Sequence, residues 1–331
     1  MKRILTGLKP TGELTLGNYI GSILQMKELQ EKYESYIFIA DMHATTIYQD
    51  PKELQERIRK FIALYIACGI EPNKNIIYLQ SENEYIPAIS WLLEYNTYYG
   101  EASRMIQFKE KRKENTNFSI GLLTYPILMA ADILYLDSDF IPVGIDQKQH
   151  VELARNIAER FNKTYGETFN LPEPLISKEG IKIKDLKNPK KKMSKSDENP
   201  NGVITMLDSR EDIIKKIMSA TTDSEKSIKY DEEIKPGISN LMNICIALTD
   251  ETIESLEIKF SGKSYGDFKK YTAEVVVNKL EKIQKKYYQL LGSRELDEIL
   301  DNGIKRSKEL AKIKFKVMKD KMGLKRWYKN Y

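Results

Sequence analysis

Lys192 and Lys195 stand three positions apart in a short segment, Lys-Met-Ser-Lys-Ser, whose residue types suit a site that handles phosphate groups. A lysine ammonium is a point charge on a flexible stem, so two of them can follow phosphates that move during a reaction. Ser194 and Ser196 are short hydrogen-bonding residues that leave access to such a site open. A basic linker or targeting run would explain the lysines before this segment, but not the Met-Ser-Lys-Ser within it.

A second phosphate-binding feature is predicted near the N-terminus, where Thr15-Leu16-Gly17-Asn18 lies at the expected start of a helix. Gly7, Gly12 and Gly17 let the backbone approach a ligand closely. The first turn of a helix offers unpaired N–H groups and a partial positive charge, both of which attract phosphate. Turn formation and capping explain the glycines equally well, but they do not explain the lysine pair. The two features together predict a site for a nucleotide triphosphate.

Alternating strand and helix patterns in the first half of the chain would position these residues. Buried-strand patterns occur at 3–6, 36–40, 75–80 and 140–143, and helical patterns at 18–33, 51–68 and 147–161. Strands separated by helices of this length predict a parallel sheet with helices on both faces. Ligands of such sheets bind at the carboxyl ends of the strands, so we expect the site in the loops after Thr6, Ala40 and Val143.

The strand pattern stops at Asp208, and only helical stretches are predicted beyond it, at 210–218, 238–248, 252–260, 268–290, 293–300 and 307–321. The predicted fold class is α/β, with a Rossmann-like doubly wound parallel sheet in a catalytic domain followed by an all-helical domain. We assign residues 1–187 to the catalytic domain, 188–202 to a mobile lysine-rich loop and 203–331 to the helical domain.

The composition is that of an ordinary soluble protein. The chain has 331 residues, 41% of them hydrophobic and 31% charged, and no apolar run approaches the length of a membrane span or a signal peptide. Cys68 and Cys245 lie in apolar helical contexts, which is typical of free thiols in a reducing compartment. His43 and His150 are too few and too isolated for a zinc site. We therefore expect a cytoplasmic protein with no membrane segment and no metal-ligand set.

The C-terminal tail is basic. Between Lys305 and Lys329 most charged residues are lysine or arginine, opposed only by Glu309 and Asp320, which indicates a polyanion such as RNA as a partner. A solvated helix face explains the same charges about as well. Ala311, Phe315, Met318 and Met322 recur at helical spacing, so we expect a helix packed on the protein with its lysines outward.

These motifs resemble those of a known enzyme family. Thr15 to Asn18 looks like the first motif of the class I aminoacyl-tRNA synthetases, and Lys192 to Ser196 reproduces their second motif in full. The runs at 108–111, 121–134, 143–153 and 236–241 are similar to bacterial tryptophanyl-tRNA synthetases. The resemblance extends over essentially the whole chain, and it implies the fold, reaction and partners of that family.

The implied reaction has two steps. The carboxylate of L-tryptophan attacks the α-phosphorus of ATP to give tryptophanyl-adenylate and pyrophosphate, and the terminal ribose of tRNA(Trp) then takes the tryptophanyl group. ATP would enter with Mg²⁺. The family resemblance also implies a homodimer, in which the helical domain of one subunit reads the anticodon of a transfer RNA whose acceptor end reaches the other subunit.

Asp132 is predicted to recognise the tryptophan side chain. That side chain has one polar atom, an N–H that only donates, so its pocket should be flat and apolar with one buried acceptor. Asp132 follows the apolar run Leu128-Met129-Ala130-Ala131. A lone aspartate is more often a helix cap or a solvated carboxylate, and the resemblance is what favours the buried acceptor. An acceptor that phenylalanine leaves unpaired rejects it by on the order of 10⁴-fold, whereas tyrosine, which can also donate, must be excluded by pocket shape.

The resemblance implies further site residues, although plain core packing would explain the apolar ones. Those expected at tryptophan are Leu5, Gly7, His43, Tyr125, Met129, Asp132, Ile141, Val143 and Gln147. Those expected at ATP are Lys9, Pro10, Thr11, Gly17, Asn18, Gly144, Ile145, Asp146, Ile183, Lys192, Met193, Ser194, Lys195 and Ser196. Catalytic roles are expected for Lys192, Lys195, Lys111 and Asn18.

Two residues depart from the family pattern. Lys9 stands where many relatives carry glutamine beside ATP, and Ile145 replaces a common glutamate between Gly144 and Asp146. Both changes remove polarity or add positive charge near the nucleotide, so we expect an altered nucleotide affinity with the activity retained.

Two alternatives remain at this point. A tyrosyl-type class I synthetase is disfavoured by the Leu-Met-Ala-Ala-Asp run that ends at Asp132. A paralogue that binds RNA or tryptophan without charging transfer RNA is disfavoured by the intact Lys192, Lys195, Gly17 and Asn18, because such a binder is free to lose the lysines.

Overall fold

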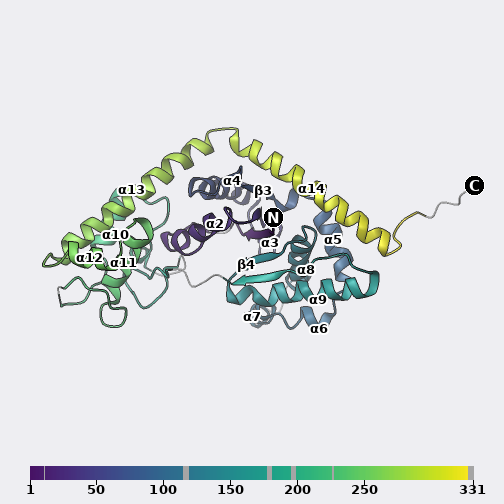
Figure 1. The fold of residues 1–331 in the computed structure, drawn as a ribbon, viewed down its shortest axis with the longest axis horizontal. Helices are drawn as coiled ribbons and strands as arrows, with labels where there is room; N and C mark the ends of the chain where they lie inside the picture. Colours follow the sequence, from purple (N-terminus) through teal and green to yellow (C-terminus); the bar gives the residue numbers. More distant parts are fainter. Residues whose placement is uncertain (11, 115–118, 177–180, 195–198, 226, 327–331) are drawn as a thin grey trace, which may run out of the picture.

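The computed structural model describes residues 1–10, 12–114, 119–176, 181–194, 199–225 and 227–326. In this part of the chain, parallel strands form one sheet in the order β3-β2-β1-β4-β5 (Figure 1). The strands are β1 (Arg3–Leu8), β2 (Glu34–Ile39), β3 (Asn75–Leu79), β4 (Phe140–Val143) and β5 (Glu173–Ile176). The predicted parallel Rossmann-like sheet is therefore confirmed, and its order reverses between β1 and β4.

Strand β5 was not predicted from the sequence. It begins one residue after Pro172 and contains Pro174, and prolines are a signal against strand assignment. The strand pairs only with β4, so it lies at the edge of the sheet, where a missing backbone donor does not break a second ladder.

Two helical layers cover the sheet. One core joins the first face to η1 (Tyr19–Ile23), α2 (Leu24–Leu29) and α4 (Pro51–Ala67), and a second core joins the other face to α5 (Tyr85–Glu94), α8 (Ile120–Leu134) and α9 (Lys148–Tyr165). The remaining short elements before residue 203 are α1 (Leu16–Asn18), α3 (Asp41–Ala44), η2 (Gln80–Glu82), α6 (Tyr99–Ala102), α7 (Ile106–Glu114), η3 (Ile145–Gln147) and η4 (Pro200–Gly202). Asp50 caps α4 as predicted, accepting hydrogen bonds from the backbone N–H groups of Lys52 and Glu53.

Helices make up the rest of the described chain: α10 (Arg210–Met218), α11 (Pro236–Leu248), α12 (Ile253–Lys259), α13 (Tyr265–Leu291) and α14 (Glu295–Lys321). The predicted all-helical region after 208 is thereby confirmed. Figure 1 shows α10, α11 and α12 gathered under α13 at one end of the molecule, with α13 and α14 forming an arch that returns to the sheet. No helix among the described residues is long and apolar enough to cross a membrane.

The prediction of two helices at 293–300 and 307–321 was wrong, because α14 is continuous. Gly303 lies against strand β3 so closely that a Cβ there would be 1.8 Å from the carbonyl oxygen of Ile77. The glycine therefore allows a close approach of helix to strand, and it does not end the helix.

The C-terminal half of α14 is part of the hydrophobic core that packs on the sheet. Ala311 and Met318 are fully buried, which confirms the packed face predicted for the tail. The Tyr135 hydroxyl lies 2.7 Å from both the Tyr78 hydroxyl and Ser307 Oγ. This buried group of hydroxyls fixes α14 to β3 and to the end of α8.

Candidate active site

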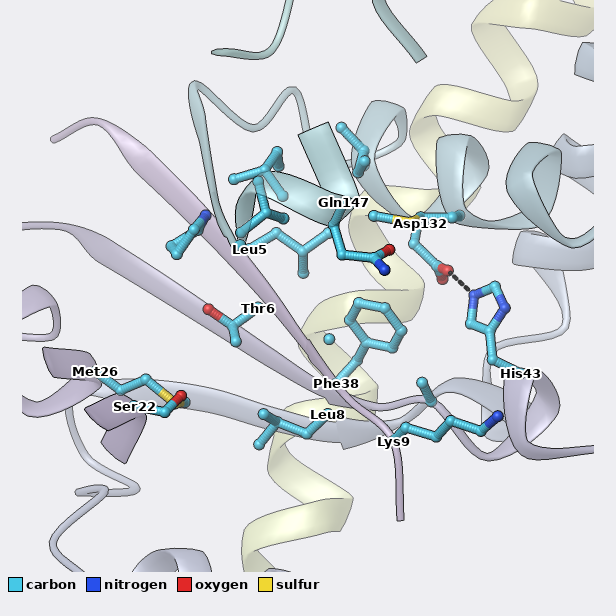
Figure 2. Close-up of a pocket in the computed structure, with 18 of the residues that line it drawn as sticks. Leu5, Thr6, Leu8, Lys9, Ser22, Met26, Phe38, His43, Asp132 and Gln147 are labelled. Carbon is cyan, nitrogen blue, oxygen red and sulfur yellow. Dashed lines mark hydrogen bonds and ion pairs between the residues drawn. The ribbon is translucent and has the colours of Figure 1, made fainter. Parts of the chain in front are cut away.

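A cavity of about 470 Å³ lies at the carboxyl ends of β1 and β4, where the order of the sheet reverses. Such a reversal is the usual ligand site of an open α/β sheet. Residues of both strands line it, and Figure 2 shows side chains from β1, α2 and α8 around it. The loops after the first, second and fourth predicted strands all contribute to its wall, as the sequence suggested.

Asp132 is the buried polar centre of this cavity. The side chain is 0% exposed, and its Oδ2 accepts a hydrogen bond from Gln80 Nε2 at 2.7 Å and lies 3.2 Å from His43 Nε2 (Figure 2). Its other oxygen, Oδ1, has no hydrogen-bond partner among the described residues. Burial raises the pKa of this carboxyl, against the opposing effect of its hydrogen bonds with His43 and Gln80. The arrangement leaves one buried acceptor available for a donor on a ligand.

Apolar groups surround that acceptor. Leu5 and Ile141 are buried in the two central strands, and Met129 stands one helical turn before Asp132. The Phe38 ring packs against Gly7, where a Cβ would be 2.6 Å from the ring. The glycine thus makes room for a flat aromatic wall, which suits a flat apolar ligand with a single N–H donor.

Polar groups form the rim on the side of α8. The Tyr125 hydroxyl donates to Gln107 Oε1 at 2.9 Å and lies 3.0 Å from His150 Nε2. Burial raises the pKa of Tyr125 to about 12, so the hydroxyl stays protonated at neutral pH. Lys9 and Gln147 add two more polar side chains to the cavity lining (Figure 2).

The lysine-rich segment and the N-terminal motif lie together. A Cβ on Gly17 would be 3.3 Å from the Cβ of Met193, so the glycine lets the lysine-rich segment pack against the start of α1. Met193 and Ile183 are both buried, and the Met193 N–H donates to the Ile183 carbonyl at 3.0 Å. Lys192 is exposed beside this buried pair. The backbone therefore anchors the segment and leaves its cation at the surface.

Asn18 has a local structural task. Its Oδ1 accepts a hydrogen bond from the Thr15 N–H at 3.0 Å, and its own N–H donates to Thr15 Oγ1 at 3.2 Å, so the two residues form a capping box. The Asn18 side chain is exposed, and its amide N–H groups are directed by this bond. The cap thus fixes the start of the helix and the orientation of the amide at the same time.

The cavity brings together all of the residues predicted for tryptophan and part of those predicted for ATP: Leu5, Gly7, Lys9, His43, Tyr125, Met129, Asp132, Ile141, Val143, Gly144 and Gln147. Pro10 is buried two residues after the end of β1, Ile145 is 80% exposed, and Ser194 is exposed. Thr11, Lys195 and Ser196 lie outside the described residues, as do the side chains of Lys111 and Asp146. Their roles stay predictions.

Sequence reasoning missed Gln80 and Phe38. Gln80 directly follows β3, so its position at the carboxyl end of a parallel strand was a usable signal. Phe38 belongs to a continuous apolar strand, where nothing separates a ligand wall from ordinary core. Thr6 points to the other side of β1 from Leu5, because successive residues of a strand point to opposite faces. Figure 2 shows Ser22 and Met26 on that same side.

Comparison with known proteins gives consistent matches. Residues 1–281 match the family model described as tRNA synthetases class I (W and Y). The tryptophan–tRNA ligase of Bacillus subtilis is 51% identical over 97% of this chain and 97% of its own length. Among solved structures, a tryptophanyl-tRNA synthetase from Campylobacter jejuni complexed with ADP and tryptophan has a TM-score of 0.85, with 37% identity over 97% of this chain and 99% of that one. The tryptophanyl-tRNA synthetase of Mycoplasma pneumoniae has a TM-score of 0.82, with 38% identity over 98% of each chain.

Proposed function

The chain belongs to the tryptophan and tyrosine family of class I tRNA synthetases and has the activity of a tryptophan–tRNA ligase, and we propose that the cavity at the ends of β1 and β4 selects tryptophan and joins it to ATP. The observation that carries this proposal is the buried Asp132, whose Oδ1 has no partner among the described residues. The indole N–H would donate to this oxygen while the ring lies against Phe38 and the apolar side chains around it.

Selectivity follows from the same geometry. A phenylalanine ring in this cavity would leave Oδ1 of Asp132 buried and unpaired, which costs far more than an unmade hydrogen bond at the surface. Tyrosine could donate to Oδ1, but its hydroxyl extends along the ring axis and the indole N–H does not. The narrow apolar wall of Leu5, Phe38 and Ile141 would therefore distinguish the two by shape.

The first step of the reaction needs positioning and charge neutralisation. The tryptophan carboxylate attacks the α-phosphorus, the bond between that phosphorus and the β-phosphate oxygen breaks, and pyrophosphate leaves with the electron pair. A carboxylate is already ionised at neutral pH, so no general base is required. Binding both substrates in one cavity and stabilising the charge on the phosphates would supply most of the acceleration.

The N-terminal motif and the lysine segment would hold the phosphates. Helix α1 begins at Leu16, and the backbone N–H of Gly17 would face the triphosphate, because those of Leu16 and Asn18 donate to the Ile204 carbonyl and to Thr15 Oγ1. Lys192 and Lys195, with Lys111 and the Asn18 amide, would follow the departing pyrophosphate. Mg²⁺ would be carried by the triphosphate, because the described residues contain no group of three or more histidine, cysteine or acidic side chains that could hold a metal ion.

In the second step a hydroxyl of the terminal ribose of tRNA(Trp) attacks the tryptophanyl carbonyl carbon, and AMP leaves. The helical domain would bind the anticodon end of that transfer RNA. We place the enzyme in the cytoplasm, a location supported by Cys68 and Cys245, which are both buried free cysteines.

A homodimer is supported by exposed aromatic side chains on α5 and the segment that follows it. Trp91 is 72% exposed, Tyr95 is 79% exposed and Tyr99 is 71% exposed. Trp91 and Tyr95 are four residues apart on one helical face, and large exposed apolar side chains that gather in this way mark interaction surfaces on soluble proteins. Sedimentation should give twice the chain mass of 38.5 kDa, and a monomer for the purified enzyme with both substrates would contradict this part of the proposal.

Exchange between pyrophosphate and ATP tests the proposed activity directly. Radioactive pyrophosphate should enter ATP when tryptophan is present, and not when tyrosine or phenylalanine replaces it at the same concentration. Transfer RNA is not needed for this first step, so the assay isolates the cavity from the helical domain. Exchange supported by tyrosine, or no exchange with tryptophan, would overturn the proposal.

A further inference from the structure

The lysines of α14 fall into two sets. Those of the first set bind groups of neighbouring segments and hold the helix in place. Lys314 Nζ lies 2.7 Å from both carboxylate oxygens of Asp137, and its side chain is only 11% exposed. Lys321 Nζ donates to the Gly166 carbonyl at 3.3 Å. The expectation that the tail lysines all point outward is therefore wrong for Lys314, because it forms an ion pair that fixes α14 to the catalytic domain.

The other set forms no ion pair. Lys312, Lys316 and Lys319 follow one another at helical spacing, so they share one face of α14. None of them, nor Lys325 or Arg326 beyond the helix, pairs with a carboxylate in the described part of the chain. Positive charge is thus concentrated on one side of the helix and is not neutralised there.

These cations line a groove. Its volume is about 990 Å³, and Asp320 is the one acidic residue in its described lining. The half-buried rings of Tyr85 and Phe315 form part of its wall, as a tilted pair with centroids 5.9 Å apart. In Figure 1 this end of α14 lies beside α5, at the opposite end of the molecule from α10, α11 and α12.

We propose that this groove binds the sugar–phosphate backbone of the transfer RNA, at a contact separate from helices α10, α11 and α12. The inference rests on the proposed function, which supplies the RNA. Lysines without ion-pair partners that neutralise phosphates release the counterions condensed on a nucleic acid, and this release is the main source of affinity that does not depend on sequence. A hollow lined by cations fits a strand of polyanion, whereas the flat surface of an anionic bilayer would reach only its rim.

The test replaces the three lysines of one helix face, in the variant Lys312→Gln/Lys316→Gln/Lys319→Gln. Its affinity for the transfer RNA, measured by filter binding, should fall about tenfold or more. The dependence of log affinity on log salt should become less steep by roughly one for each phosphate that is no longer neutralised. The KM for transfer RNA in aminoacylation should rise in parallel. The substituted side chains are at the surface, so the fold should be retained.

The matched control is Lys32→Gln/Lys52→Gln/Lys163→Gln, which removes the same charge from exposed lysines elsewhere on the catalytic domain. It should bind transfer RNA as the wild type does. Equal losses in both variants would show that only net charge matters, and wild-type affinity and salt dependence in the groove variant would also overturn the proposal. So would a groove variant that loses binding to vesicles of anionic phospholipid while keeping its affinity for transfer RNA.

The proposal can fail separately from the proposed function. Exchange between pyrophosphate and ATP uses no transfer RNA, so it should be unchanged in the groove variant. If the wild type showed no tryptophan-dependent exchange, the proposed function would fail, yet filter binding would still decide whether the groove holds RNA.

Discussion

The two halves of the active site are built in different ways. On the tryptophan side, Asp132 is fully buried, and side chains from two other segments, Gln80 and His43, contact the same carboxylate oxygen. On the phosphate side, backbone hydrogen bonds anchor the chain through Met193, and the neighbouring Lys192 is exposed. The tryptophan side is a fixed set of buried side chains. On the phosphate side the backbone is fixed by hydrogen bonds, and the charged lysine side chain lies at the surface.

This difference matches the two tasks of the site. Choosing one side chain requires an acceptor whose direction is set before the ligand arrives and from which water is excluded. Neutralising a pyrophosphate that moves away requires cations that can move with it. Changes on the tryptophan side should therefore act on the KM for tryptophan, and changes on the phosphate side should act on the rate of adenylation.

The largest expected effect tests the phosphate side. We expect Lys195→Ala to slow adenylate formation by roughly 10²- to 10³-fold, because it removes a charged donor from the transition state. The affinity for tryptophan should change little. Rapid-quench measurement of adenylate formation, with tryptophan binding measured by fluorescence, separates the two quantities.

Lys190→Ala is the matched control, because it removes a nearby lysine of the run that a plain basic linker explains. Its adenylation rate should stay close to that of the wild type. An unaltered rate in Lys195→Ala, or a change mainly in tryptophan affinity, would remove the distinction between the two halves.

The dependence on pH tests the tryptophan side. Burial raises the pKa of the Asp132 carboxyl, and Oδ1 is its oxygen without a hydrogen-bond partner among the described residues. A proton on Oδ1 would turn the acceptor proposed for the indole N–H into a donor. The KM for tryptophan should therefore rise by up to about tenfold per pH unit as the pH falls below this raised pKa.

The free energy of unfolding of the enzyme without tryptophan should depend on pH in the opposite direction. Because the folded pKa of Asp132 lies above its unfolded one, its contribution to stability is fully present below the unfolded pKa and is lost as the pH rises through the folded pKa. Asp132→Asn should bind tryptophan weakly at every pH and remove both dependences. A KM for tryptophan that varies with pH as strongly in Asp132→Asn as in the wild type would assign the titration to another group.

The sequence predicted the strands of the sheet better than it predicted contacts between residues that are far apart in the chain. Strands β1 to β4 are recognisable because each is a short apolar run between helices. Asp132 was singled out because it follows the apolar residues Leu128 to Ala131 and the family resemblance favoured a buried acceptor there. Gln80 was not linked to Asp132, since 52 residues separate them and no local pattern records the pairing. The continuity of α14 was missed for a related reason: Gly303 is a poor helix former locally, and only its contact with β3 explains it.

The smallest expected effect comes from Gln80, which orients Asp132 without lining the cavity. In Gln80→Leu the carboxylate loses a 2.7 Å hydrogen bond and keeps only the contact with His43. The KM for tryptophan should rise by about 2- to 10-fold, the equivalent of one hydrogen bond, with kcat and the KM for ATP little changed. Gln30→Leu is the control, because it removes hydrogen bonds of another buried glutamine, to Glu71 and Asn75, away from the cavity. If both variants changed the KM for tryptophan equally, Gln80 would contribute only to stability, and the tryptophan side would depend on Asp132 and His43 alone.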